Sequence, residues 1–158
     1  MRKVFLRTLF VCLSVPATLW AQQLSPQRRK NQILVYKTVD TMRGLIVALA
    51  QYGQDHNDKL PPIKSLANLK AAFPPRYMAK NSFASPVTGL PFVLNKSVSF
   101  SGKTLRSVSS NTVLFYDAKP LSSYNDPRQL VRIVGYKDHI VVMPEKQWQN
   151  TKKLLHIP

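Results

Sequence analysis

The sequence predicts an α+β domain, in which a long amphipathic helix comes first, a small antiparallel sheet of about four strands follows, and a short helix ends the chain. Two observations predict this order. Apolar residues recur with a helical period between Asn31 and Gly53, and runs rich in β-branched and aromatic residues begin after Met78. The chain has 158 residues, of which 44% are hydrophobic, which is enough to bury the core of one domain.

The long helix is predicted from apolar residues three or four positions apart, which fall on one helical face: Val35, Val39, Met42, Ile46 and Leu49. A second, adjoining row widens this face: Leu45, Ala48 and Tyr52. Gly53 and the polar residues after it end the helix, and Pro61-Pro62 prevents its continuation. A short helical pattern follows at 64–73.

The sheet is predicted from four short runs, separated by turn-forming residues: 91–94, 112–116, 130–136 and 139–143. The two-residue link Lys137-Asp138 predicts a tight hairpin between the last two runs. Pro144 and Glu145 suit the first turn of a closing helix through Trp148, Leu154 and Leu155. We expect Trp148 and the Val-Val-Met run (141–143) to lie in the core.

The start of the chain has the pattern of a secretory signal. Arg2, Lys3 and Arg7 precede an apolar run at 9–15, and a small residue, Ala21, ends the segment. We expect cleavage between Ala21 and Gln22. An uncleaved anchor is the alternative, but the apolar run is shorter than the roughly 20 residues that span a membrane.

The export signal divides the chain into three parts: a signal peptide at 1–21, a basic flexible segment at 22–30 and a single domain at 31–158. Cys12 lies inside the signal, and Val11 before it is not the small residue that lipid attachment requires. The mature chain then has no thiol for a disulfide and no integral membrane span.

The mature chain is strongly basic. Removing three basic residues with the signal leaves 20 basic and seven acidic residues, a formal charge of +13. Such a charge attracts DNA or acidic polysaccharides, and Arg28, Arg29 and Lys30 form the clearest candidate anion-binding cluster. The alternative is a solvated basic surface, because the basic residues are spread along the chain and no aromatic residues alternate with them.

Four segments occur in a characteristic order: Leu-Ala-Gln-Tyr-Gly-Gln-Asp-His-Asn-Asp-Lys-Leu-Pro (49–61), Ser-Pro-Val-Thr-Gly-Leu-Pro-Phe-Val-Leu-Asn (85–95), Ser-Gly-Lys-Thr-Leu (101–105) and Asn-Thr-Val-Leu-Phe-Tyr-Asp-Ala-Lys-Pro (111–120). In order and spacing they resemble the globular domains of bacterial type II secretion pseudopilins, relatives of type IV pilins. The similar group ends in a signature of His, nine residues and Asp-Gly. The resemblance spans residues 31–155 and implies a pilin-like headgroup.

The chain departs from this family at two places. Arg128 stands where the signature has its histidine, and Asp138-His139 lacks the signature's glycine. A pilin also keeps an apolar half-helix with a glutamate near its start, whereas the only glutamate here is Glu145 and residues 22–30 are polar and basic. Such residues are costly to place in a membrane, so we expect a soluble, secreted relative without the prepilin helix.

Oxygen donors gather between two predicted strands, where Asp117, Ser123 and Asp126 form a candidate calcium site. Calcium takes about six to eight oxygen ligands, and the resemblance implies one, since major pseudopilins hold calcium in a loop before their last strands. Lys119 and Arg128 flank this loop, and Asp and Ser are also common in turns without a metal. Both readings stay open, and no other cofactor is expected.

Motifs of catalysis are weak in this chain. Ser101-Gly102-Lys103-Thr104 matches the end of a phosphate-binding loop, but Ser97 replaces the glycine that such a loop needs, which favours a surface turn. His56, His139 and His156 lie far apart in the sequence, and no Gly-x-Ser-x-Gly motif is present. We therefore expect no catalytic residues and no enzymatic activity.

These features favour an exported, non-enzymatic pseudopilin-like protein that acts by binding. The expected partner is a protein of the secretion or pilus apparatus, and the expected place is the periplasm or the outside of a bacterial cell. One alternative is a basic envelope protein that binds DNA or an acidic polysaccharide. The other is an envelope hydrolase, which has only Asp138-His139 to support it.

Overall fold

The computed structural model describes residues 25–61, 65–73, 76–77, 80–98 and 103–158. The helices are α1 (Pro26–Asp55), α2 (Leu66–Ala72) and α3 (Glu145–Leu154), with short 3-10 helices η2 (Lys80–Phe83) and η3 (Leu105–Ser107). The strands are β1 (Val93–Leu94), β2 (Val113–Tyr116), β3 (Leu121–Ser122), β4 (Leu130–Tyr136) and β5 (Ile140–Pro144). This confirms the predicted α+β fold with its long first helix, although the described sheet has five strands.

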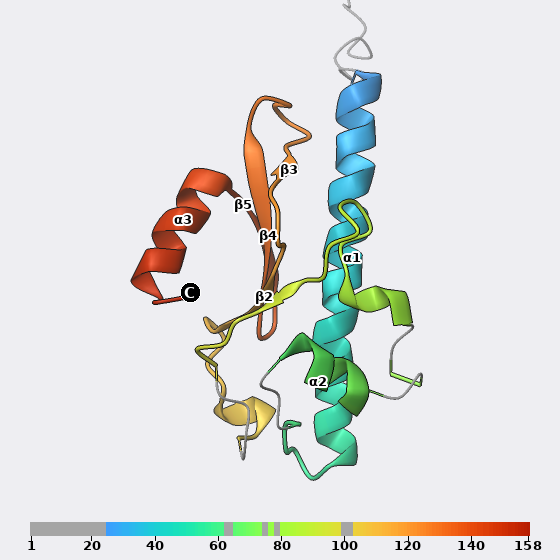
Figure 1. The fold of residues 1–158 in the computed structure, drawn as a ribbon, viewed down its shortest axis with the longest axis vertical. Helices are drawn as coiled ribbons and strands as arrows, with labels where there is room; N and C mark the ends of the chain where they lie inside the picture. Colours follow the sequence, from blue (N-terminus) through green and yellow to red (C-terminus); the bar gives the residue numbers. More distant parts are fainter. Residues whose placement is uncertain (1–24, 62–64, 74–75, 78–79, 99–102) are drawn as a thin grey trace, which may run out of the picture.

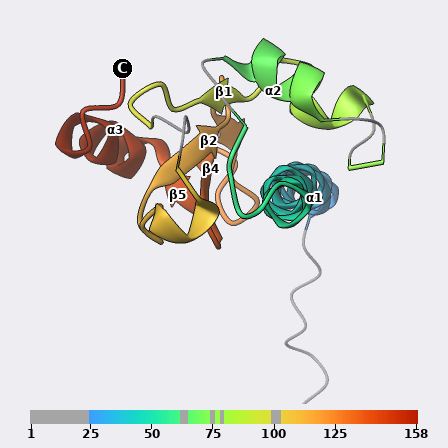
Figure 2. The same cartoon turned by 90° about the horizontal axis from the view of Figure 1, so that it is seen from below.

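The domain has three layers, with the sheet between α1 on one face and α3 on the other (Figures 1 and 2). β4 is the central strand, and all its pairings are antiparallel: β2 and β3 share one edge of it, while β5 takes the other. Successive side chains of a strand alternate between faces. Val131 and Ile133 therefore join the core beside α1, whereas Val134 joins the core beside α3.

α1 begins at Pro26, five residues earlier than its apolar period predicted. The hydroxyl of Ser25 accepts a hydrogen bond from the backbone N–H of Arg28 at 3.3 Å, and Pro26 occupies the first turn. Both residues are common helix-start signals. The prediction of a flexible basic segment is therefore wrong for its described part, residues 25–30, which form the cap and first turn of α1.

The predicted face of α1 is the one that packs on the sheet. Its fully buried members lie in the larger core cluster: Val35, Met42, Leu45, Ala48 and Leu49. Gly135 of β4 permits the close approach, because a Cβ atom there would lie 2.8 Å from the Sδ atom of Met42. A larger residue at this position would force the Met42 side chain to shift.

The core between the sheet and α3 is built around Trp148, as predicted. Its ring lies 4.8 Å from that of Tyr116, and Met143 and Ile157 are buried beside it. Of the predicted Val-Val-Met run, Met143 is buried and Val141 packs against this cluster, but Val142 is 38% exposed on the other face of the outer strand β5. Leu154 is 79% exposed at the end of α3. Leu155 is also exposed.

Two local predictions are confirmed. The N–H of Tyr136 donates to the carbonyl of His139 at 2.8 Å, which closes the two-residue hairpin at Lys137-Asp138. The short helical pattern corresponds to α2, whose first turn is capped by the Ser65 hydroxyl. β3 was missed, because two residues are too few to show a strand period.

The predicted signal at 1–21, with its cleavage between Ala21 and Gln22, lies outside the described residues, as do Ser101 and Gly102 of the phosphate-loop-like motif. Within the part of the chain that the structure describes, no helix has both the length and the apolar character needed to cross a membrane.

Candidate functional site

A buried, hydrogen-bonded polar group lies between the sheet and α3, around Arg132. This arginine is 6% exposed and extends from the face of β4 that α3 covers. Its Nε and Nη2 atoms donate to the two carboxylate oxygens of Glu145 at 2.9 and 2.6 Å. Its Nη1 atom donates to the backbone carbonyl of Asp117 at 2.7 Å. A guanidinium bound at both ends of a carboxylate is the strongest common ion-pair geometry.

Glu145 is suited to this contact by its position at the first turn of α3, where the helix dipole favours negative charge. Burial raises the pKa of its carboxyl, but the hydrogen bonds from Arg132 and Gln149 outweigh burial and hold the pKa below its usual value. The glutamate is therefore ionised across the ordinary pH range, and the pair ties α3 to β4.

Asp117 lies on the other side of Arg132, and its carboxyl differs from that of Glu145 in lacking a hydrogen-bond partner and in having a raised pKa. Its side chain is fully buried, and neither carboxylate oxygen has a hydrogen-bond partner among the described residues. Burial raises the pKa of Asp117 to about 7, while the charge of Arg132 and the nearby Ser85 hydroxyl limit the rise. The Ser85 hydroxyl lies near the carboxyl without completing a hydrogen bond of ordinary geometry.

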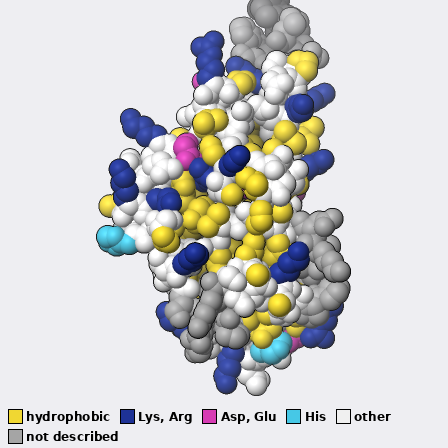
Figure 3. Space-filling model, viewed as in Figure 1, with side chains coloured by type: hydrophobic (Ala, Val, Ile, Leu, Met, Phe, Trp, Pro, Cys, Tyr) yellow, Lys and Arg dark blue, Asp and Glu magenta, His cyan; other side chains and the backbone are white. Residues whose placement is uncertain are grey.

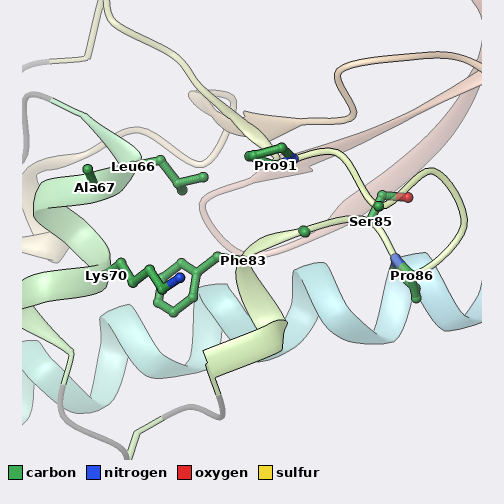
Figure 4. A pocket seen from close by; sticks show the side chains of 9 residues that line it. Leu66, Ala67, Lys70, Phe83, Ser85, Pro86 and Pro91 are labelled. Atoms are coloured by element: carbon green, nitrogen blue, oxygen red, sulfur yellow. The ribbon is translucent and has the colours of Figure 1, made fainter.

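Ser85 connects this buried carboxyl to a cavity of about 630 Å³ between α2 and the segment 83–91. Figure 4 shows Leu66 and Lys70 extending from α2 toward that segment. Most of the lining is apolar: Leu66, Ala67, Phe83, Ala84, Pro86 and Pro91. Ser85 and Lys70 are the polar side chains that line it, and Lys70 has no acidic partner among the described residues.

The wall opposite α2 is a tight hairpin. The N–H of Phe92 donates to the carbonyl of Phe83 at 3.0 Å, and the N–H of Ser85 donates to the carbonyl of Leu90 at 2.9 Å. Gly89 turns the chain with a φ of +68°, a conformation that other residues adopt at a cost. The hairpin thus holds Ser85 between the cavity and Asp117.

The structure brings together two of the three residues predicted to bind calcium. The Ser123 hydroxyl accepts the N–H groups of Asn125 at 3.2 Å and Asp126 at 3.5 Å, and Asp126 Oδ1 accepts the N–H of Arg128 at 3.0 Å. These oxygens are thus already used within the turn. The side chains that act on the Asp117 carboxyl are Arg132 and Ser85 instead.

The donor set therefore fits a hydrogen-bonded turn better than a calcium site. Among the described residues, no three His, Cys, Asp or Glu side chains are placed to hold one metal ion. Calcium at Asp117, Ser123 and Asp126 stays a prediction from the sequence.

The basic cluster lies beside this turn, at the start of α1. Asn31 is buried and its Nδ2 atom donates to the carbonyl of Ser123 at 3.3 Å, which ties the first turns of α1 to the β3–β4 connection. Arg29 and Lys30 are exposed there. Other Lys and Arg side chains are scattered over the face in Figure 3, both at its edge and within it. These side chains give the surface a diffuse positive charge that attracts anions, but they do not form a single defined anion-binding site.

Asp138 and His139 are in contact but in the wrong order for catalysis. His139 Nδ1 lies 2.8 Å from Asp138 Oδ1, and the His139 ring stacks on Tyr136 with centroids 4.6 Å apart. The hydrogen bond with His139, and a second with Ser110, lower the pKa of Asp138. Ser110 thus acts on the aspartate, whereas a catalytic triad needs the histidine between serine and acid.

Sequence reasoning missed Lys70, Ser85 and Arg132. Arg132 carried a signal, because a charge between Val131 and Ile133 in a buried strand requires a partner, and Glu145 is the chain's only glutamate. Lys70 and Ser85 carried none, since they meet only after α2 and the hairpin pack together. Comparison of the chain with protein-family models, curated proteins and solved structures finds no match.

The raised pKa of Asp117 predicts a pH-dependent stability. Below the unfolded value of 3.8 the carboxyl is protonated in both states, so the group costs nothing. As the pH rises to about 7 the unfolded chain ionises and the folded chain does not, which lowers the free energy of unfolding by on the order of 4 kcal/mol. Asp117→Asn removes this loss. In urea unfolding, the free energy of unfolding of the variant relative to that of the wild type should therefore increase between pH 4.5 and pH 8.

Asp126→Asn is the matched control, because Asp126 is exposed in its turn and an asparagine can still accept the N–H of Arg128. It should follow the pH dependence of the wild type. A constant stability difference between Asp117→Asn and the wild type over this pH range would contradict the assignment.

Proposed function

We infer that this protein is an exported, non-enzymatic, pseudopilin-like protein that acts by binding a protein of a type II secretion or type IV pilus-like system. The observation that supports this most is how the four pseudopilin-like segments associate. Leu60 N–H donates to the carbonyl of Lys103 at 2.9 Å, which joins 49–61 to 101–105. Asn95 Nδ2 donates to the carbonyl of Val113 at 3.0 Å, which joins 85–95 to 111–120.

One of these segments forms part of the wall of the cavity. Ser85, Pro86, Gly89 and Pro91 of the second segment line it, and Asp117 of the fourth lies behind Ser85. A segment that resembles a family thus lines the cavity, and a residue of another lies directly behind it, which supports binding there. The arrangement of Asp138 and His139 favours binding over nucleophilic catalysis as well.

The chemistry of the cavity favours a particular partner. Its apolar walls suit an apolar side chain, and Lys70 at its lining offers a positive charge to an acidic group beside it. A peptide segment of a partner protein, with an apolar residue next to a carboxylate, fits both properties. Export follows from the predicted signal at 1–21.

The export proposal predicts the N-terminus of the mature protein. Mass spectrometry of the protein recovered from its native host should find a chain that begins at Gln22, because Ala21 ends the predicted signal. A chain that begins at Phe10 or Val11 with a methylated terminal amine, packed in filaments, would instead show processing as a true prepilin and overturn the proposal.

The cavity proposal predicts the binding of an apolar anion. Anilinonaphthalene sulfonate, which joins an aromatic body to a negative charge, should bind saturably and gain fluorescence. Lys70→Glu should weaken this binding about tenfold, because an attraction becomes a repulsion, and Ala67→Trp should weaken it by filling the cavity.

Lys37→Glu is the matched control for net charge, since Lys37 is exposed on α1 and is not among the residues that line this cavity. Its affinity for the probe should stay within about twofold of the wild type. Equal losses in Lys37→Glu and Lys70→Glu, with no effect of Ala67→Trp, would show that the cavity is not the site.

A further inference from the structure

The outward face of α1 carries a stripe of exposed apolar side chains, at whose edge the Tyr36 ring stacks on Tyr124 with centroids 6.3 Å apart. Ile33, Tyr36 and Val47 are 48%, 53% and 48% exposed. Each residue of a helix advances by about 100°, so these three side chains fall on one narrow face, opposite the buried Met42 and Leu49. Figure 2 shows α1 end-on at the margin of the molecule, with the sheet on one side of it.

An ion pair lies in the middle of this stripe. Arg43 Nη1 lies 2.8 Å from Asp40 Oδ1, and the two side chains are 63% and 69% exposed. An apolar stripe that is interrupted by one positive and one negative charge packs poorly against a purely apolar surface, because both charges would lose water without gaining a partner there. It suits a surface with a positive group facing Asp40 and a negative group facing Arg43.

The stripe itself is such a surface. Asp40 and Arg43 are equidistant from the midpoint between Thr41 and Met42, and so are Tyr36 and Val47. We propose that α1 is the interface of a homodimer, in which two α1 helices pack antiparallel about a twofold axis through this midpoint. This inference is independent of the proposed function and of the cavity.

The twofold axis fixes each contact. Asp40 of each protomer meets Arg43 of the other. The interface is isologous, so this ion pair occurs twice, once on each side of the twofold axis. Tyr36 packs against Val47 of the second protomer, and Val47 against Tyr36. Ile33 lies opposite Ala50, which is small and half-buried and leaves room for it.

The charges at the ends of α1 favour the same direction. An antiparallel pair places the basic residues Arg28 and Arg29 near Gln54 and Asp55 of the partner. A parallel pair would place the two basic starts together and set Asp40 against Asp40. Like charges in contact are unfavourable, so the parallel arrangement is rejected.

The expected affinity is moderate. The stripe from Ile33 to Val47 is about 21 Å long, which gives a small interface. The formal charge of +16 on the chain opposes association at long range, though physiological salt screens this repulsion beyond about 8 Å. We expect a dissociation constant on the order of 10 µM.

Charge reversal tests the register of the contacts. Sedimentation equilibrium of the purified protein, at about 150 mM salt, should show a monomer–dimer equilibrium. Asp40→Arg and Arg43→Asp should each weaken it at least about tenfold, because each places like charges together at both symmetric contacts. Combining both changes in one chain should restore the dimer, and so should mixing the two single variants in equal amounts.

Thermal unfolding of each variant shows that it is folded, since the exposed pair contributes little within one helix. A wild type that stays monomeric at about 100 µM, or single variants that dimerise as well as the wild type, would overturn the proposal. So would single variants that are monomeric alone and remain so when mixed. Restored association in the double variant as well as in the mixture identifies the antiparallel contact of Asp40 with Arg43, because in a parallel pair the double variant would set like charges together.

Discussion

The ion pair between Arg132 and Glu145 is the contact on which the arrangement of this domain depends. β4 is buried on both faces, and a charge in its middle is tolerable only if a partner meets it there. Glu145 does so with both oxygens, from the first turn of α3. The same guanidinium binds the carbonyl of Asp117 where β2 ends. One side chain thus joins α3, β4 and the end of β2.

A chain of contacts leads from Arg132 to the candidate site. Asp117 is held against Arg132 and Ser85 in a buried position that raises its pKa to about 7. Ser85 in turn belongs to the hairpin that forms one wall of the cavity beside α2. One wall of the cavity is therefore a hairpin closed by backbone hydrogen bonds, while the other is a helix of only two turns. Such a site suits binding a partner segment. The exposed stripe of α1 is a separate surface, which we propose for association with a second copy.

How far the sequence could predict this structure depends on the range of each interaction. The face of α1, the Lys137-Asp138 hairpin and the Trp148 core were predictable, because period, turn length and helix-start residues are local signals. The start of α1 at Pro26, the strand β3 and the exposure of Leu154 were not, since packing decides them. Neither was the cavity, because Lys70, Ser85 and Asp117 come together only through tertiary contacts. The candidate calcium residues show the same limit: Ser123 and Asp126 share a turn, and Asp117 has other neighbours.

A double-mutant cycle on the central ion pair tests this account most directly. Arg132→Met and Glu145→Leu should each lower the free energy of unfolding in urea by about 3 kcal/mol, because each leaves a charge or polar group without its partner. The double variant should lose much less than the two single losses together, with a coupling energy of about 2 kcal/mol. Single losses that simply add, to within about 0.5 kcal/mol, would show that the pair does not hold α3 on the sheet.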